Sequence, residues 1–415
     1  MSTSRLFRAV RCLKALPVVL LALLMLPAVG GATAPHPTVD TTTHELKDSV
    51  TNTALQLRGV NFTGSEYMCF DDTANETFDI PATTTTINRM KAWKINVVRL
   101  PINEDCWVGA NGYPTTDPSD PPVMTPQKYQ GDLSRWVNTL VANNIAVQVN
   151  MHFYAPGTDP STDQSFMADR DHARTFWTQV ANTWKANPAV IFDLVNEPQA
   201  QTSGDPGASP AAWDCWKNGD PSCTAAFGAW GNAGVAGMDD LIASVRSTGA
   251  TNPIVADGLR FGNDLTGWLT HKPTDPTGQL IAGFHNYGDF AGCTGLTCYT
   301  TQVEPVNTQV PVIAGEFGDF DCTAAYPNTF MSWADTQPHK VSYIAWAWTN
   351  GDCADEPALL TNLNGTPSTY GRAVCTHYRT LAGFSDCAAG SPPTLARTAK
   401  VSSKKASAQR ASRKR

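Results

Sequence analysis

The sequence predicts an α/β protein of the (β/α)8 type, a TIM barrel, with long loops pinned by disulfides. Short β-branched apolar runs alternate with helical patterns eight times between residues 53 and 388, and no low-complexity linker divides that region. Polar side chains recur where the apolar runs end. Near-continuous apolar strands that alternate with helices indicate a parallel sheet covered on both faces. An open doubly wound sheet is the alternative, but no Gly-x-Gly-x-x-Gly motif follows the first strand.

Each element is predicted from its own apolar pattern. The predicted strands are, in chain order, Leu55–Phe62, Ile95–Pro101, Ile145–His152, Ala189–Asn196, Pro253–Asp257, Leu280–His285, Val310–Glu316 and Val341–Trp348. The predicted helices are Thr83–Trp93, Pro126–Asn143, Asp171–Ala186, Ala225–Thr248, Asn263–His271, Thr301–Thr308, Tyr326–Gln337 and Ser368–Leu381. One helix follows each strand, as a (β/α)8 barrel requires.

Residues 1–34 have the pattern of a secretory signal peptide. Four basic residues and no acidic one precede an apolar run, Ala15–Gly31, which the small residues 32–34 follow. A single membrane anchor is the alternative, but the run is at the short limit for crossing a bilayer and no charged stop follows it. We expect cleavage within residues 30–35 and a secreted protein with no stable membrane insertion.

The charge of the chain is unevenly distributed. The net charge is −7, from 30 basic and 37 acidic residues. Residues 1–34 and 391–415 hold 12 of the basic residues and none of the acidic ones, so the middle of the chain carries a net charge of −19. Such an acidic body repels nucleic acid, which excludes a nucleic-acid partner. The basic tail, residues 389–415, has almost nothing to bury, and we expect it to be disordered.

The cysteines predict disulfides rather than a metal centre. The chain has eleven cysteines, and signal cleavage would remove Cys12 and leave an even number for an oxidising compartment. No Cys-x-x-Cys pair and no His-Glu-x-x-His motif occurs, so no metal site is expected. Spacing does not settle the connectivity. Three short-range pairs are the simplest choices, namely Cys215 with Cys223, Cys293 with Cys298 and Cys375 with Cys387.

Polar and aromatic side chains lie at or just beyond the carboxyl ends of six predicted strands. These residues are Arg99, His152, Asn196, Glu197, His285, Tyr287, Glu316 and Trp346. In a (β/α)8 barrel, the carboxyl ends of all strands converge on one mouth, where the active site lies. A strand-end arginine or histidine taken singly is more often structural, but so many at one mouth indicate a site.

Two of these residues, Glu197 and Glu316, are carboxylates that end apolar strands. A buried carboxylate needs partners or a raised pKa, because ionisation without a partner costs several kcal/mol. Two carboxylates across a mouth suit cleavage of a glycosidic bond. A separation of about 5–5.5 Å gives retention through a covalent intermediate, and about 6.5–9.5 Å gives inversion. The alternative is that both carboxylates only hold loops.

The motifs around these glutamates resemble those of family 5 glycoside hydrolases, which include many cellulases and mannanases. Asn196–Pro198 and Gly315–Gly318 carry the resemblance, and Arg99, His152, the run 285–287 and Trp346 support it. The resemblance covers residues 55–385, nearly the whole predicted mature chain. It implies a catalytic domain over residues 53–388, a monomer without cofactors, and a polysaccharide substrate. Residues 35–52 form a Thr- and Pro-rich segment before that domain.

The resemblance also implies a role for each site residue. Glu197 would be the acid/base and Glu316 the nucleophile of a retaining mechanism. Arg99 and Tyr287 would keep Glu316 ionised, and Asn196 would bind the sugar 2-hydroxyl.

His152 and His285 would line the same subsite, and Trp346 would form its floor. Two features stand apart from this pattern. Asn150 occupies a position where relatives often have an acidic residue, and Trp348 is a second candidate floor, since residues 346 and 348 of a strand face the same way.

Further aromatic residues follow the predicted strands and could stack on sugar rings in an open cleft. These possible subsite residues are Trp107, Tyr154, Trp213, Trp216 and Phe261. The alternative, equally weighted for each of them, is packing inside the loops beside the disulfides.

The resulting hypothesis is a secreted, retaining endo-β-1,4-glucanase. A β-mannanase or another β-glucanase of the same family is the alternative within the class. A non-catalytic carbohydrate-binding protein is the alternative of another class, and the presence of both glutamates disfavours it.

Overall fold

Eight parallel strands close into a barrel and confirm the predicted fold. The computed structural model describes residues 33–70, 75–115, 123–199, 208–223, 233–288, 292–353, 355–384 and 386–387. The barrel strands are, in spatial order, β4 (Arg58–Asn61), β5 (Val97–Asn103), β6 (Ala146–Phe153), β7 (Val190–Asp193), β8 (Ile254–Asp257), β9 (Leu280–Tyr287), β10 (Val312–Gly318) and β11 (Ser342–Ala345). Every one overlaps a predicted strand, and β11 pairs with β4 to close the ring.

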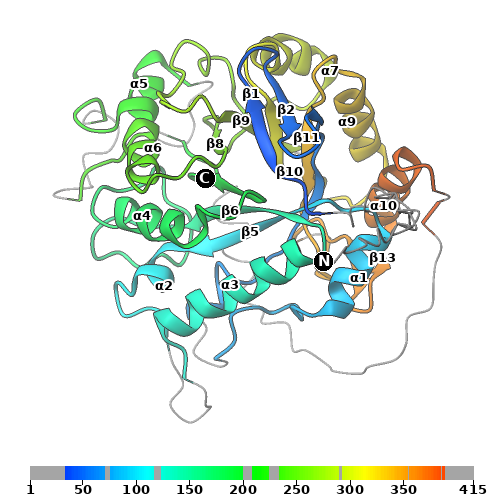
Figure 1. Cartoon of the computed structure of the whole chain (residues 1–415), viewed down its shortest axis with the longest axis horizontal. Helices are drawn as coiled ribbons and strands as arrows, with labels where there is room; N and C mark the ends of the chain where they lie inside the picture. The colour runs from blue at the N-terminus through cyan, green and yellow to red at the C-terminus, as the bar shows by residue number, and fades with distance from the viewer. Residues whose placement is uncertain are drawn as a thin grey trace, which may run out of the picture. The chain divides into compact units, whose positions relative to one another are not determined.

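The longer helices lie outside these strands (Figure 1). They are α1 (Thr84–Ala92), α3 (Pro126–Ala142), α4 (Ala173–Trp184), α6 (Met238–Ser247), α9 (Ala325–Thr336) and α10 (Thr369–Leu381). Side-chain caps start three of them, since Thr83, Thr125 and Ser368 each accept a hydrogen bond from a backbone N–H of the first turn. Their inward faces are apolar and their outward faces polar, as the sequence pattern requires.

Two predicted helices differ from the structure. The segment Asn263–His271 forms turns, because the Asp264 carboxylate bonds the backbone N–H and hydroxyl of Thr266 and so competes with helical bonding. The helix expected over Ala225–Thr248 begins at Met238, after its N-cap Gly237, and residues 225–232 lie outside the described residues.

Short helical pieces occupy several loops. They are η1 (Met68–Phe70), α2 (Glu104–Val108), α5 (Pro210–Asn218), α7 (Leu296–Cys298), η2 (Tyr299–Val303) and α8 (Glu304–Asn307). The last two correspond to the helix expected over Thr301–Thr308. Neither α2 nor α5 is expected from the sequence pattern. Both belong to the long loops on the mouth side of the barrel.

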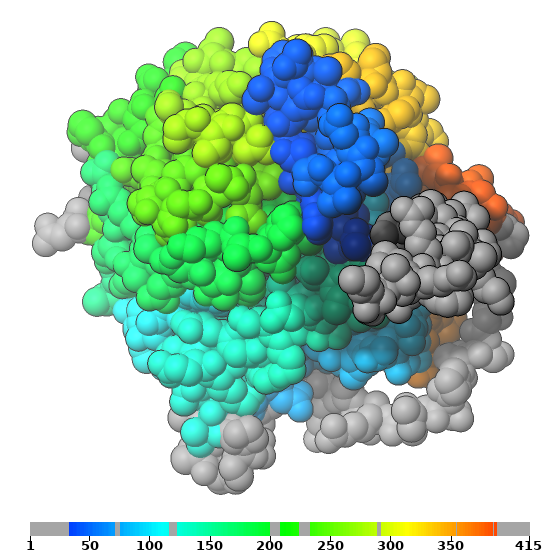
Figure 2. All heavy atoms as spheres, in the orientation of Figure 1, coloured from blue at the N-terminus to red at the C-terminus, as the bar shows by residue number. Residues whose placement is uncertain are grey.

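A three-stranded antiparallel sheet precedes the barrel, where the sequence indicated only a Thr- and Pro-rich segment. Its strands are β1 (Pro37–Asp40), β2 (Glu45–Asp48) and β3 (Thr53–Ala54). Val39 and Leu46 pack in one apolar cluster with a residue from each barrel strand, such as Val97 and Ile281, or, for β4, with Leu57 just before it. The hairpin β1–β2 therefore closes the amino-terminal end of the barrel. Figure 2 shows it on the face toward the viewer.

Five disulfides hold the loops. They are Cys69–Cys106, Cys215–Cys223, Cys293–Cys298, Cys322–Cys353 and Cys375–Cys387. The three short-range pairs match the expected ones. The other two join cysteines 37 and 31 residues apart and could not be paired from spacing. A two-stranded sheet, β12 (Leu360–Asn362) with β13 (Thr366–Pro367), lies between the Cys322–Cys353 pair and α10.

Both expected terminal segments are largely outside the described residues. This applies to the signal peptide up to residue 32 and to the tail from residue 388. Among the residues that the structure describes, none of the helices has the length and apolar character needed to cross a bilayer.

Candidate active site

The polar residues singled out in the sequence converge at the carboxyl end of the barrel. Glu316 belongs to β10, His285 and Tyr287 belong to β9, and Arg99 belongs to β5. Asn196 and Glu197 follow β7 by a few residues. All are buried, so their charges and hydrogen-bonding groups must be satisfied by one another.

Glu316 receives a donor on each carboxylate oxygen. Arg99 donates from Nη1 to Oε1 over 2.8 Å, and the Tyr287 hydroxyl donates to Oε2 over 2.6 Å. Burial and the negative charge of Glu197 both raise the pKa of Glu316, whereas the positive charges of His285 and Arg99 lower it. The lowering effects are larger, so the pKa of Glu316 lies below its usual 4.5. Glu316 is therefore ionised at neutral pH.

Arg99 connects Glu316 to the strands around it. Its Nε donates to Asp193 over 2.7 Å, its Nη2 to the side-chain oxygen of Asn196 over 2.8 Å, and its Nη1 also to Asn61 over 3.1 Å. The guanidinium fork makes all these bonds at once from a rigid plane, which a lysine ammonium cannot do. Burial disfavours the charge, yet Asp193 and Glu316 raise the pKa of Arg99 above its ordinary value.

Glu197 is held from two sides. On one side, Nε2 of Gln164 donates to Oε2 of Glu197 over 2.8 Å. The side-chain oxygen of Gln164 in turn accepts a hydrogen bond from the Asn196 amide over 2.5 Å. On the other side, Nδ1 of His285 lies 3.0 Å from Oε1 of Glu197. Glu197 has φ of 50° immediately before Pro198, a backbone conformation that costs on the order of 1–3 kcal/mol and is typical of functional sites.

His285 contacts three carboxylates. Besides Glu197, Nδ1 lies 3.6 Å from Glu316 and Nε2 lies 3.3 Å from Asp257. Burial lowers the pKa of His285, but the surrounding carboxylates outweigh burial and raise the pKa to about 10. The imidazolium therefore supplies a positive charge between the two glutamates.

The two glutamates lie close together. One oxygen of Glu197, one oxygen of Glu316 and one nitrogen of His285 all lie within 4.8 Å of one another. This is the short spacing of carboxylates that act on the same bond. These donor atoms could approach a metal ion, but Arg99, Tyr287 and Gln164 already use the carboxylate oxygens.

Trp346 and His152 form a stacked pair at the same mouth. Their ring centroids are 5.4 Å apart with an interplanar angle of 14°. Nδ1 of His152 lies 3.0 Å from the side-chain oxygen of Asn150. The Asn150 amide therefore orients the His152 ring, at a position where relatives often have an acidic residue. Trp346 also packs with Tyr287 in a small apolar cluster.

Trp348 faces away from this mouth, which corrects the expectation that residues 346 and 348 point the same way. Strand β11 ends at Ala345, so strand alternation does not extend to either tryptophan. The Trp348 ring packs edge-to-face on Trp93 in the core, with centroids 4.9 Å apart. Of the two candidate floors, only Trp346 lies at the site.

Four of the five possible subsite aromatics are buried and pack inside the protein, which favours the packing alternative that the sequence left equally open. Trp107 packs on Phe176 and Trp184, and Trp213 and Trp216 pack on each other, all with rings that are buried.

The hydroxyl of Tyr154 lies 2.9 Å from the carbonyl oxygens of both Asn196 and Ser165, so this buried side chain supports the loop beside the site. Phe261 is half-buried, with φ of 60° in the turn after β8, and stays a prediction.

Four residues at the site were missed in the sequence. Asp193 ends β7, Asp257 ends β8 and Asn61 ends β4, so their strand-end position was a usable signal. Gln164 lies in the irregular loop after β6, and its sequence surroundings carry no such signal.

Burial and the negative charge of Asp257 raise the pKa of Asp193 to about 6, although Arg99 acts to lower it.

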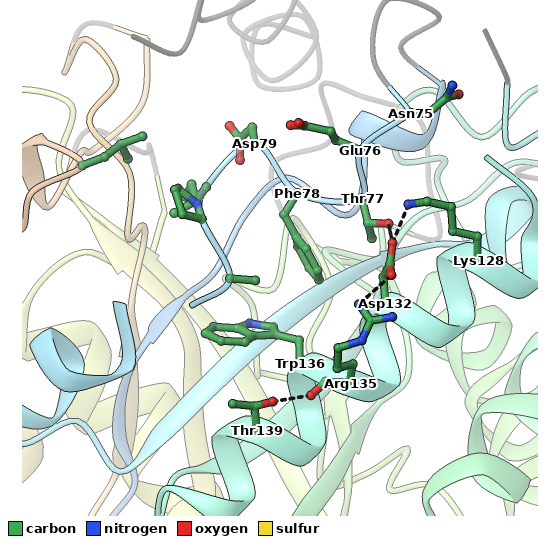
Figure 3. Close-up of a pocket in the computed structure, with 14 residues that line it drawn as sticks. Asn75, Glu76, Thr77, Phe78, Asp79, Lys128, Asp132, Arg135, Trp136 and Thr139 are labelled. Carbon is green, nitrogen blue, oxygen red and sulfur yellow. Dashed lines mark hydrogen bonds and ion pairs between the residues drawn. The ribbon is translucent and has the colours of Figure 1, made fainter. Parts of the chain in front are cut away.

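A cavity of about 550 Å³ lies elsewhere, between residues 75–82 and α3 (Figure 3). Phe78 and Trp136 form an apolar side of it, and Lys128 and Arg135 both pair with Asp132 at its polar side. Neither glutamate of the barrel mouth lines this cavity, so it is separate from the candidate site.

A parallel barrel with two glutamates this close at its carboxyl end is typical of glycoside hydrolases. Residues 49–352 match the cellulase family, glycosyl hydrolase family 5. Because this match covers well over half of the chain, the protein belongs to that family and is a glycoside hydrolase.

Sequence relatives are endoglucanases. The chain is 28% identical over 157 residues to the endoglucanase of Halalkalibacter akibai, a match that covers 37% of this chain but only 16% of that protein. It is 25% identical over 268 residues to a manganese-dependent endoglucanase of Phanerodontia chrysosporium, which covers 55% of this chain and 62% of the relative.

Solved structures share the fold. The β-glucanase SdGluc5_26A of Saccharophagus degradans, in complex with cellotetraose, has a TM-score of 0.59 at 17% identity over 84% of this chain and 94% of its own. The catalytic domain of a mannanase from Streptomyces sp. SirexAA-E has a TM-score of 0.54 at 18% identity, over 85% of this chain and 93% of its own.

Proposed function

We propose that the chain is a secreted endo-β-1,4-glucanase that hydrolyses its substrate with retention. The observation that carries the proposal is the pair Glu197 and Glu316 at the barrel mouth, where one carboxylate oxygen of each lies within 4.8 Å of the other. Retaining enzymes place their two carboxyl groups about 5–5.5 Å apart, because the second carboxylate itself attacks the sugar.

Glu316 is the nucleophile in this proposal. Its lowered pKa keeps it ionised, and Arg99 and Tyr287 orient its oxygens. A Glu316 oxygen bonds to the anomeric carbon as the glycosidic C–O bond breaks. Glu197 donates its proton to the departing oxygen, so the leaving sugar departs as a neutral alcohol.

In the second step, Glu197 acts as base. It takes a proton from water, the water oxygen attacks the anomeric carbon, and the bond to Glu316 breaks. Two inversions give overall retention. His285, between the two carboxylates, offsets their mutual repulsion when both are ionised.

The remaining residues would form the subsite of the sugar at the scissile bond. The Asn196 amide, held by Arg99 and Gln164, would bind the 2-hydroxyl of that sugar. Trp346 offers the flat apolar surface on which the C–H face of a sugar packs, and His152 lies stacked beside it.

A glucan substrate is supported by the endoglucanase names of the sequence relatives and by the cellotetraose complex of a similar fold. A β-mannan is the second candidate, because a mannanase catalytic domain matches over 93% of its length. Glucose and mannose differ at C2, so the contacts of Asn196 bear directly on this choice.

Secretion is supported by the five disulfides, which persist in oxidising compartments. The predicted signal peptide at residues 1–34 would direct the chain there.

The nucleophile is tested by chemical rescue. Glu316→Gly should lower kcat by at least about a thousandfold, because the covalent step is lost. Added azide should restore turnover and give a glycosyl azide of inverted configuration. Full activity without azide would refute the assignment of Glu316. The corresponding Glu197→Gly variant should instead give an azide product of retained configuration.

The substrate is tested by reducing-sugar release and product-length analysis on carboxymethyl cellulose, glucomannan, β-mannan and laminarin. We expect the fastest release from carboxymethyl cellulose, with products of mixed length that indicate endo action. Faster release from β-mannan would favour the second candidate. Binding without release from any polysaccharide would instead identify a non-catalytic carbohydrate-binding protein.

A further inference from the structure

A second cluster of metal-ligating side chains lies away from the two glutamates. Glu104 is the first residue of α2, directly after β5. Asp169 and His172 end the long loop that runs from β6 to α4. One ligand atom from each of the three lies within 4.8 Å of the other two.

The backbone fixes both carboxylates in place. Oε2 of Glu104 accepts from the N–H of Ala155 over 3.3 Å, and Oδ1 of Asp169 accepts from the N–H groups of His172 and Ala173. Each carboxylate is thus anchored through one oxygen. The other oxygen of each, Oε1 and Oδ2, accepts no hydrogen bond from a donor group of the described residues.

Three buried atoms of this cluster have no hydrogen-bond partner among the described residues. They are Oε1 of Glu104, Oδ2 of Asp169 and Nδ1 of His172. The side chains of Glu104 and Asp169 are fully buried. An unpaired polar atom in such a place costs about 1–3 kcal/mol, and more when it is charged.

The charges around the cluster are also unbalanced. Within the described part of the chain, neither Glu104 nor Asp169 pairs with a lysine or arginine, and the nearby Arg170 and Arg174 both pair with Asp240 instead.

Two further acids lie beside these carboxylates. Asp105 is buried next to Glu104, and Asp171 lies 4.0 Å from His172. A cation bound among these acidic side chains would balance their negative charges.

We propose that Glu104, Asp169 and His172 bind one divalent transition-metal ion, Zn²⁺ or Mn²⁺. The imidazole nitrogen distinguishes the site from the all-oxygen sites that Ca²⁺ and Mg²⁺ prefer. Ligand atoms around such an ion lie roughly 3–3.5 Å apart, so the three side chains contract by about 1–2 Å at most. Asp171 and water are available to complete the coordination.

The ion would stabilise the loop between β6 and α4. Its ligands connect the end of that loop, at Asp169 and His172, to Glu104 on the neighbouring loop. The same loop carries Gln164, which bonds Glu197. The ion is therefore structural, and it positions Gln164 without touching the substrate. The proposal does not depend on the identity of the substrate.

The test measures metal content and thermal unfolding of the full chain. The protein is stripped with EDTA and dialysed against Zn²⁺, Mn²⁺ or Ca²⁺ in separate samples. We expect one equivalent of Zn²⁺ or Mn²⁺ per chain by elemental analysis. Tm should rise by about 3 °C or more at saturation, because the ion binds the folded chain alone.

Matched variants locate the ion. His172→Gln and Glu104→Gln should each lower the affinity at least about tenfold and remove most of the Tm shift. His271→Gln, a histidine on another loop whose ion-pair contact is with Asp214, should bind like the wild type. Glu316→Gln should also retain the ion, which separates this site from the barrel mouth.

Three results would overturn the proposal. Stoichiometric binding of none of the three ions, with no change in Tm, would mean that the buried carboxyls are neutralised by protons. Binding that survives in His172→Gln and Glu104→Gln would place the ion elsewhere. Binding of Ca²⁺ alone would exclude a transition-metal site. The wild-type measurement stands even if a variant fails to fold.

Discussion

Arg99 is a fully buried cation that the fold can carry only because it is surrounded by acceptors. It bonds Asp193, Glu316, Asn196 and Asn61, which come from the ends of three strands, β7, β10 and β4. A buried charge without such partners costs several kcal/mol. The same bonds fix the orientation of the Glu316 carboxylate, so the arginine both stabilises the barrel mouth and prepares the nucleophile.

His285 predicts a pH dependence of stability. Its pKa is about 10 in the folded chain, raised from 6.5, so the folded chain binds a proton more tightly than the unfolded chain. The resulting stabilisation is fully present below pH 6.5 and is lost as pH rises through 10. The free energy of unfolding should fall over this window, as measured by urea denaturation at pH 6.5, 8, 9 and 10.

The His285→Gln variant is the control for this effect. It keeps a hydrogen-bond donor but cannot titrate, so its unfolding free energy should be lower than that of the wild type at pH 6.5. The two curves should converge toward pH 10. Parallel curves would mean that His285 does not hold the extra proton.

The side chain of Gln164 connects the loop between β6 and α4 to the site. Gln164→Ala removes a donor to the Glu197 carboxylate and the acceptor that holds Asn196. Hydrogen bonds to charged groups contribute about 1.5–3 kcal/mol, so we expect kcat/KM on carboxymethyl cellulose to fall about 10- to 100-fold. Gln179→Ala, exposed on α4, is the matched control. An unchanged rate in Gln164→Ala would show that the bonds of Gln164 to Glu197 and Asn196 do not contribute to catalysis.

The hairpin β1–β2 is expected to support stability and not catalysis. Leu46 is buried at the closed end of the barrel, opposite the mouth, in contact with the inner layer of strand residues. Leu46→Ala should lower the free energy of unfolding by about 2–3 kcal/mol and leave kcat/KM at 25 °C unchanged.

The control for the hairpin is Val50→Ala, since Val50 is 60% exposed and packs little. Its unfolding free energy should remain within about 0.5 kcal/mol of the wild type. A loss of activity in Leu46→Ala while the protein remains folded would contradict the separation of the two barrel ends.

The disulfides act on the whole molecule, because they limit the unfolded chain. The two longest loops, closed by Cys69–Cys106 and Cys322–Cys353, should each contribute about 3–4 kcal/mol. We expect reduction to lower Tm sharply. Thiol titration of the denatured, unreduced protein should give one free thiol for the full chain and none once the segment with Cys12 is removed. Two or more free thiols in the processed chain would show that a pair is open.

Local patterns in the sequence predict most of the barrel. Short β-branched apolar runs that alternate with helical patterns are typical of a parallel sheet covered on both faces, so all eight strands are predicted from local pattern. The carboxyl ends of the strands must meet at one mouth, and this rule alone places Arg99, Glu197, His285 and Glu316 close together. Short cysteine spacings make pairs such as Cys215–Cys223 the simplest choices, and the structure confirms them, although spacing alone does not settle the connectivity.

Loops carry no such periodicity, and their side chains take the direction that packing against distant segments imposes. Only the tertiary structure could therefore turn Trp346 to the mouth and Trp348 into the core, or bury Trp107 on α4. The same holds for Gln164, and for the hairpin that closes the barrel. The sequence alone determined the barrel and its two glutamates, because these depend on local pattern and strand order. Packing between segments distant in the sequence decided the directions of the loop tryptophans, the position of Gln164 and the placement of the hairpin.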